Sequence, residues 1–337
     1  MIKKFSTFII AEAGVNHNGK LNLAYKLVDA AKNAKADCVK FQLFDHKELS
    51  TTNASQASYQ TKNTKKKLTQ YELLRKLEMN FHSLKKIKNY CKKKKIDFLL
   101  SIFGTEQLKI IKKLNLNSIK IPSGEINNYP LLNEISKLNK EIIISTGMST
   151  LEEIKYAINI LTKRKLNSKK IILLQCTTDY PTKLKDVNLN VISTLKKYFN
   201  LPMGLSDHTM SNEAAIAAVA LGAKVIEKHI TLDNKMNGPD HKASLNPIKF
   251  KEFVKSIRNT EKLLGSFVKR PSKLEIKNKK FVRKSIVAKK KINKGDKFTF
   301  KNITCKRPEG GISPRHWTKV IGKKSKYFFQ ENDFIII

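Results

Sequence analysis

Eight apolar runs, each followed by a segment of helical periodicity, constrain the fold of this chain more than any other feature of its sequence. Such alternation predicts an α/β fold, and near-continuous apolar strands are typical of a parallel sheet covered on both faces. Eight β-then-α units in about 250 residues are the count and size of a TIM (β/α)8 barrel. An open, doubly wound sheet is the alternative, but the count of eight favours closure, and no G-x-G-x-x-G follows the first run. The expected strands are Phe8–Val15, Cys38–Phe44, Phe98–Phe103, Ser118–Ser123, Glu141–Gly147, Ile171–Thr178, Met203–Thr209 and Lys224–Leu232.

Polar residues stand at the end of nearly every expected strand. The carboxyl ends of barrel strands meet on one face, where barrel enzymes assemble their active sites. One such residue is usually a loop-entry hydrogen bond, but their recurrence on seven strands predicts an active site. The candidates are Glu12, Lys40, Gln42, Lys120, Ser123, Ser145, Tyr180, His208, Glu227, His229 and Asp240.

Two histidines lie near the ends of consecutive expected strands, His208 in G-L-S-D-H-T and His229 in V-I-E-K-H-I. Histidines placed in this way can converge on one divalent metal ion. Glu227, two residues before the second histidine, could act as a base or orient a ligand. The alternative is a pair of hydrogen-bonded core histidines, and the other polar strand ends favour the metal site.

Two lysines, Lys40 and Lys120, are expected inside apolar strands, where an unpaired charge is costly. Each would pair either with an anionic substrate or with a carboxylate of the barrel, Glu12 or Glu125. The sequence leaves both possibilities open for either lysine alone.

Hydroxyl and backbone N–H groups gather at two expected helix starts, around Ser123 and Ser145. Groups of this kind suit a phosphate or a carboxylate. Together with the two lysines and the metal site, they predict a small, doubly anionic substrate.

The segment Ser50–Gln70 is polar and too long for a plain connection between a strand and a helix. We interpret it as a lid or substrate loop, with a decorated surface loop as the alternative.

The net charge of +39 suggests nucleic acid or another anionic surface as partner. However, lysine supplies nearly all of it and is spread along the whole chain, whereas arginine is the preferred reader of phosphates and bases. We therefore expect no nucleic-acid partner, but a positive electrostatic field that favours anionic substrates.

The four cysteines form no C-x-x-C pair, which predicts a reducing, cytoplasmic location. No run approaches the roughly 20 apolar residues of a membrane span, so no membrane partner is expected.

The pattern changes after the last helical segment. We expect a barrel domain over residues 1–268, a basic linker over 269–280 and a small β-rich domain over 281–337. The expected strands of the small domain are Lys284–Ala288, Lys297–Phe300 and Phe334–Ile337. A domain of this size is marginal alone, so it is expected to pack on a barrel or on a partner subunit.

Several motifs of the barrel segment resemble the bacterial sialic acid synthases. They include F-I-I-A-E-A-G-V-N-H-N-G, V-K-F-Q, I-K-I-P-S-G-E, G-L-S-D-H-T and V-I-E-K-H-I-T-L-D. The later stretches R-K-S-I-V-A-K-K-K-I-N-K-G-D and K-R-P resemble the SAF (antifreeze-like, β-clip) domain of that family. The resemblance covers essentially the whole chain and implies a TIM barrel followed by a SAF domain.

The resemblance implies a reaction in which phosphoenolpyruvate condenses with the open-chain aldehyde of N-acetylmannosamine. Water is consumed, and phosphate and N-acetylneuraminate, a nine-carbon 2-keto acid, are released. It also implies a divalent metal, Mn²⁺ or Mg²⁺, and a domain-swapped homodimer.

Roles for individual residues follow from the resemblance, position by position. It implies that Glu227 handles the activated water and that Glu12, Lys120 and His229 also act in catalysis. The metal ligands would be His208 and His229, and the phosphoenolpyruvate ligands would be Lys40, Lys120, Ser123 and Ser145. The sugar would meet Glu12, Gln42, Tyr180 and Asp240, and Arg307 from the second subunit.

Other substrates and other classes of protein remain open. Thr177-Thr178 stands where sialic acid synthases often carry an asparagine, and this pair resembles the legionaminic acid synthases at least as much. N,N'-diacetyllegionaminate or pseudaminate is therefore the alternative product. A Kdo-type or DAHP-type synthase would share the barrel but lack the appended domain, and a lysine-rich nucleic-acid-binding protein is the distant alternative.

Overall fold

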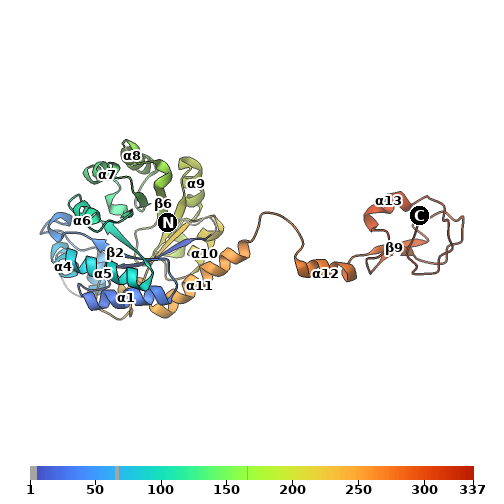
Figure 1. Cartoon of the computed structure of the whole chain (residues 1–337), viewed down its shortest axis with the longest axis horizontal. Helices are drawn as coiled ribbons and strands as arrows, with labels where there is room; N and C mark the ends of the chain where they lie inside the picture. Colours follow the sequence, from blue (N-terminus) through green and yellow to red (C-terminus); the bar gives the residue numbers. More distant parts are fainter. Residues whose placement is uncertain (1–5, 65–67, 165) are drawn as a thin grey trace. The chain divides into compact units, whose positions relative to one another are not determined.

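The computed structural model describes residues 6–64, 68–164 and 166–337. Within them, eight parallel strands form a closed barrel in sequence order, with β1 paired to both β2 and β8 (Figure 1). The TIM barrel expected from the sequence is thus confirmed. The strands are β1 (Phe8–Gly14), β2 (Cys38–Leu43), β3 (Asp97–Ile102), β4 (Ser118–Ile121), β5 (Glu141–Ser145), β6 (Ile171–Cys176), β7 (Met203–Asp207) and β8 (Val225–His229).

Helices surround the barrel and bury their apolar faces against it. The principal ones are α1 (Leu21–Asn33), α5 (Phe81–Lys94), α6 (Gln107–Lys113), α7 (Tyr129–Ser136), α8 (Leu151–Thr162), α9 (Asn190–Phe199), α10 (Glu213–Ala220) and α11 (Pro247–Leu264). Several begin at a side-chain cap, such as the Thr150–Glu153 capping box of α8.

Three further helices precede α5 among the described residues between β2 and β3. They are α2 (His46–Leu49), α3 (Ser58–Thr64) and α4 (Gln70–Leu77). α4 and α5 are separate helices, because Asn80 caps α5 by accepting a hydrogen bond from the backbone N–H of Ser83.

Strand parity decides which side chains enter the barrel. Successive residues of a strand point to opposite faces, so Glu227 and His229 of β8 face inward while Lys228 faces the helices. Inward side chains nearer the N-terminal ends of the strands form a small apolar core, which excludes water from the barrel interior. Its members are Phe8, Ile10, Cys38, Leu99, Ile143, Ile172, Leu174 and Val225.

The chain divides into two compact units, Met1–Gly265 and Ser266–Ile337. In the second, β9 (Ser285–Ala288) pairs antiparallel with β10 (Ile303–Lys306) over a core of its own. The expected strands around residues 297–300 and 334–337 form isolated bridges instead, through Lys297 and Phe334. The stretch interpreted as a linker contains a helix, α12 (Lys273–Val282), which the capping box of Ser272 and Glu275 starts.

Candidate active site

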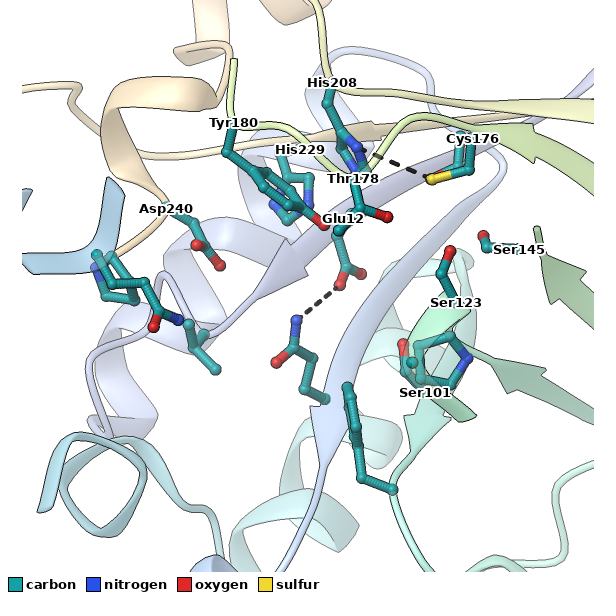
Figure 2. Close-up of a pocket in the computed structure, with 18 of the residues that line it drawn as sticks. Glu12, Ser101, Ser123, Ser145, Cys176, Thr178, Tyr180, His208, His229 and Asp240 are labelled. Atoms are coloured by element: carbon teal, nitrogen blue, oxygen red, sulfur yellow. Dashed lines mark hydrogen bonds between the residues drawn. The ribbon is translucent and has the colours of Figure 1, made fainter. Parts of the chain in front are cut away.

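A cavity of about 370 Å³ opens where the barrel strands end. Every candidate that the sequence predicts within the barrel lines it, which places Glu12, Lys40, Gln42, Lys120, Ser123, Ser145, Tyr180, His208, Glu227, His229 and Asp240 together. In Figure 2 the serines lie on one side of Glu12, and Tyr180 and Asp240 lie on the other. Arg307 belongs to the second unit, where it is exposed on the turn after β10.

Four buried charges form the floor of the cavity. The Lys40 Nζ lies 3.0 Å from Glu12 Oε2 and 3.6 Å from Glu227 Oε2, and the Lys120 Nζ lies 3.4 Å from Glu227 Oε1. Lys40 of β2 and Lys120 of β4 therefore share one carboxylate, that of Glu227. Of the two possibilities that the sequence leaves open for these lysines, the structure shows each one paired with a barrel carboxylate, and the partner of Lys120 is Glu227 rather than Glu125.

Serine hydroxyls complete the shell around these charges. Each lysine donates a hydrogen bond of 2.6 Å, Lys40 to Ser101 and Lys120 to Ser145. Ser206 donates to Glu227 at 3.1 Å. Ammonium and hydroxyl groups are thus already directed at one small volume, which is the arrangement an anionic ligand needs.

The charges of the floor change one another's protonation. Burial would raise the pKa of Glu227, but Lys120 and Lys40 outweigh it and hold this pKa at about 2. Burial raises the pKa of Glu12; Lys40 opposes this rise and the charge of Glu227 adds to it. Burial also raises the pKa of Asp240, to about 7. The site therefore holds one firmly ionised carboxylate beside two that accept a proton more readily.

His208 and His229 line the cavity as neighbours at the ends of β7 and β8, with tilted rings whose centroids are 5.4 Å apart. The Nδ1 of His208 lies 2.7 Å from the carbonyl of Thr177, which leaves Nε2 available to a ligand. The Nδ1 of His229 is buried and has no hydrogen-bond partner in the described part of the chain. A buried, unpaired imidazole nitrogen beside an oriented second imidazole fits a divalent metal ion.

The protonation of the two histidines differs. Burial holds the pKa of His229 well below its usual value, so this ring is neutral and able to bind a metal. Burial also lowers the pKa of His208, but the neighbouring Cys176 thiol and Thr177 carbonyl raise it overall. A metal ion would displace the extra proton from His208.

Sequence reasoning missed part of the cavity wall. Ser101, Cys176 and Ser206 line it from strands β3, β6 and β7. Their inward parity was a usable signal, but small hydroxyl and thiol groups in apolar strands do not stand out as charges do.

The segment Ser50–Gln70 reaches the cavity through α3; residues 65–67 of this expected lid lie outside the described residues. The Tyr59 ring stacks on Tyr180, with centroids 5.0 Å apart, and Tyr180 in turn covers His208 at 4.2 Å. Asn63 fixes the helix by donating a hydrogen bond of 2.7 Å to the carbonyl of Pro239. The segment thus contributes side chains to the site.

Lys228 faces away from the cavity and into a second buried ion pair. Its Nζ lies 2.7 Å from Asp207 Oδ2 and donates to the carbonyl and hydroxyl of Thr209. Asp207 also accepts a hydrogen bond from the backbone N–H of Thr209 at 2.8 Å. The pair joins β7 to β8 directly behind the two histidines.

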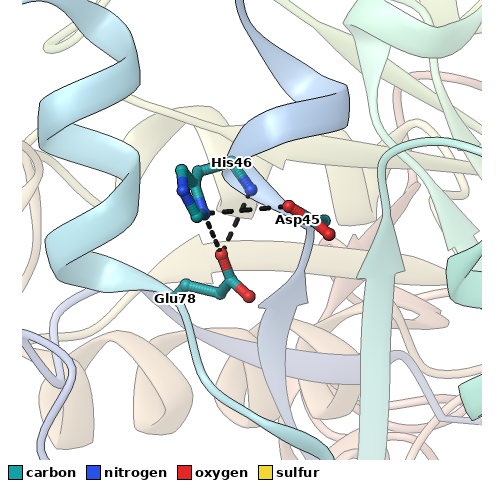
Figure 3. A group of neighbouring side chains, drawn as sticks. All are labelled: Asp45, His46 and Glu78. Atoms are coloured by element: carbon teal, nitrogen blue, oxygen red, sulfur yellow. Dashed lines mark hydrogen bonds and ion pairs between the residues drawn. The ribbon is translucent and has the colours of Figure 1, made fainter.

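A separate group of possible metal ligands, Asp45, His46 and Glu78, is shown in Figure 3. Glu78 Oε2 accepts from the backbone N–H of His46 at 3.1 Å and lies 2.6 Å from its Nδ1. Asp45 caps α2 by accepting from the backbone N–H of Lys47. The contacts between Glu78 and His46 attach the start of α2 to the end of α4, so this group has a structural role without a metal ion.

Two family models cover most of the sequence. The NeuB family model matches residues 27–269, and the SAF domain model matches residues 283–335. The chain therefore belongs to the NeuB family and carries a SAF domain after its barrel.

Three relatives illustrate the similarity. The N,N'-diacetyllegionaminic acid synthase of Campylobacter jejuni is 47% identical over 329 residues, 98% of each chain. The human N-acetylneuraminate-9-phosphate synthase is 37% identical over 331 residues, 98% of this chain and 91% of the relative. The crystal structure of an N-acetylneuraminic acid synthetase from Leptospira borgpetersenii, in complex with citrate, has a TM-score of 0.71 at 33% identity, over 81% of this chain and 90% of that one. In the part of the chain that the structure describes, no helix is long and apolar enough to cross a bilayer.

Proposed function

We propose that this protein condenses phosphoenolpyruvate with the open-chain aldehyde of an N-acetylated hexose, giving a nine-carbon 2-keto acid and phosphate. The observation that carries the proposal is the convergence of Lys40, Lys120 and their serines with the two histidines around Glu227. Relatives named as synthases of nonulosonic acids support the same reaction.

The lysine and serine side of the cavity would bind phosphoenolpyruvate. Lys40, Lys120, Ser123 and Ser145 offer two cations and two hydroxyls to its phosphate and carboxylate. Tyr180 and Asp240, on the other side of Glu12, would face the sugar. This division would bring the enol carbon of one substrate next to the aldehyde of the other.

The chemistry then needs three proton transfers. A new bond joins C3 of phosphoenolpyruvate to the aldehyde carbon as the C2=C3 double bond is lost, and the aldehyde oxygen takes up a proton to become an alcohol. Water adds to C2 and passes one proton to a base. The new C2 hydroxyl then loses its remaining proton as the bond from C2 to the phosphate oxygen breaks, which leaves C2 as a ketone and releases phosphate. His208 and His229 would hold a divalent metal ion, Mn²⁺ or Mg²⁺, which supplies Lewis-acid stabilisation to the developing alkoxide.

Glu227 would accept the proton from water. With its pKa at about 2 it is a weak base in the free site, because Lys120 and Lys40 stabilise its charge. A bound dianion would draw both ammonium groups toward itself and so raise the pKa of Glu227 when the substrate is in place. Substrate binding would thereby activate the base.

Product analysis tests the proposal. The purified protein, Mn²⁺, phosphoenolpyruvate and an N-acetylated hexose should yield one nine-carbon 2-keto acid per phosphate, identified by mass spectrometry. Phosphate formed without that acid would mean simple hydrolysis and would refute the condensation.

The identity of the hexose has two candidates. N-acetylmannosamine, giving N-acetylneuraminate, is the sugar that the sequence motifs imply. A 2,4-diacetamido-2,4,6-trideoxy hexose, giving N,N'-diacetyllegionaminate or pseudaminate, is supported about equally. Two relatives at 47% and 40% identity carry the first product in their names, and one at 36% identity carries the second.

Replacing Arg307 by alanine is expected to raise KM for the sugar by about tenfold or more, with little change in KM for phosphoenolpyruvate. The reason is the loss of a charge-assisted hydrogen bond to the sugar's N-acetyl group, which we propose Arg307 makes across a domain-swapped homodimer. Arg315→Ala, another exposed arginine of the same unit, is the matched control. Equal changes in both KM values would assign Arg307 to another role.

A further inference from the structure

One wall of the cavity belongs to the insertion between β2 and β3 and differs chemically from the floor. Helix α4 presents four cavity-lining side chains at the spacing i, i+3, i+4, i+7, which places them on one helical face. They are Gln70, Leu73, Leu74 and Leu77. The three leucines pack in an apolar cluster of their own with Val15 and Phe44, at the ends of β1 and β2.

A single polar group interrupts this apolar face. The Oε1 of Gln70 is buried and has no hydrogen-bond partner among the described residues. The backbone N–H of Gln70 donates a hydrogen bond of 2.8 Å to the carbonyl of Ala54, so only the side chain of Gln70 lacks a partner for its oxygen. A buried amide oxygen without a donor is costly, and a ligand that supplies the donor removes that cost.

We infer that Gln70 and the leucines of α4, called here the α4 wall, form a subsite for a second acetamido group and a deoxygenated carbon of the sugar. An acetamido N–H can donate to Gln70 Oε1 while its methyl group contacts the leucines. A 6-methyl group suits the same apolar surface. The inference deepens the proposed function and rests on it, because it assigns the sugar as a 2,4-diacetamido-2,4,6-trideoxy hexose.

N-acetylmannosamine fits the α4 wall less well. It carries hydroxyl groups where the other sugar carries an acetamido group and a methyl group. One hydroxyl could donate to Gln70 Oε1 in place of the acetamido N–H, but it brings no methyl group to the leucines. Leucine side chains cannot replace the water that the other hydroxyl loses on entering the cavity. A site that presents one amide among apolar groups therefore discriminates against the more hydroxylated sugar.

The test compares two sugars and two variants. Phosphate release from phosphoenolpyruvate is measured with 2,4-diacetamido-2,4,6-trideoxy-mannose and with N-acetylmannosamine, using the full-length protein with Mn²⁺. We expect kcat/KM to favour the diacetamido sugar by about tenfold or more. Gln70→Leu should reduce that preference by about tenfold, with less than a threefold change for N-acetylmannosamine.

The control is Gln56→Leu, the same chemical change in the same insertion at a residue outside the cavity lining, which should keep the preference of the unaltered protein. Circular dichroism melts verify that both variants fold. A preference for N-acetylmannosamine, or an unchanged preference in Gln70→Leu, would overturn the inference while leaving the condensation reaction intact. Absence of sugar-dependent release with either sugar would overturn the proposed function, and the inference with it.

Discussion

Replacing His229 by alanine should lower metal-dependent turnover by about 1,000-fold or more while the fold is retained. The imidazole faces the cavity, and its Nδ1 has no hydrogen-bond partner in the described part of the chain. Loss of a Lewis acid that stabilises a developing alkoxide is worth several kcal/mol, and each 1.36 kcal/mol changes the rate about tenfold.

Three measurements make this prediction specific. Steady-state rates report the loss of turnover, equilibrium dialysis with Mn²⁺ reports the loss of bound metal, and a circular dichroism melt reports the fold. His82→Ala, an exposed histidine on α5, serves as the matched control and should behave like the unaltered protein. Near-normal rates in His229→Ala would remove this residue from the metal ligands.

The second large effect concerns stability. Lys228→Met should lower the free energy of unfolding by about 3–5 kcal/mol, because Asp207 would remain buried without its cation. Both side chains are almost fully inaccessible, at 1% and 0% relative exposure for Lys228 and Asp207. Denaturant titration followed by circular dichroism measures the change.

Two further variants separate charge from volume. In Lys228→Met/Asp207→Asn the buried charge is removed and the acceptor for the Thr209 N–H is kept, so most of the lost stability should return. Lys224→Met, at an exposed lysine on the same side of β8, should cost less than about 0.5 kcal/mol. A loss below about 1 kcal/mol in the single variant would show that the Lys228–Asp207 pair contributes little.

The barrel and the buried charges of its cavity could be predicted because strand alternation and barrel closure act together. Alternation along each strand sends Glu12, Lys40 and Glu227 inward, and closure of eight parallel strands then brings their ends to one place. No pairwise contact has to be known for this conclusion. The same parity, applied strictly, would also have separated the outward Lys228 from its inward neighbours.

The small β-rich SAF domain was also predicted and is confirmed, but the α4 wall and the inner elements of the second unit were beyond such reasoning. The sequence of the insertion shows a helix pattern, but the packing of Leu73 and Leu77 on the ends of β1 and β2 depends on tertiary contacts that no local period encodes. In the second unit, short strands with few ladder bonds gave weak signals, so β10 was missed and α12 was interpreted as a linker. Capping residues such as Ser272 and Glu275 were the available clue.

The measurement that tests the account most directly is the initial rate of phosphate release from phosphoenolpyruvate with Mn²⁺, with no sugar and with each of four sugars. The four are N-acetylmannosamine, 2,4-diacetamido-2,4,6-trideoxy-mannose, the corresponding altrose, and arabinose 5-phosphate. The account predicts release only when an acetamido sugar is present. Release without sugar, or with arabinose 5-phosphate alone, would contradict it.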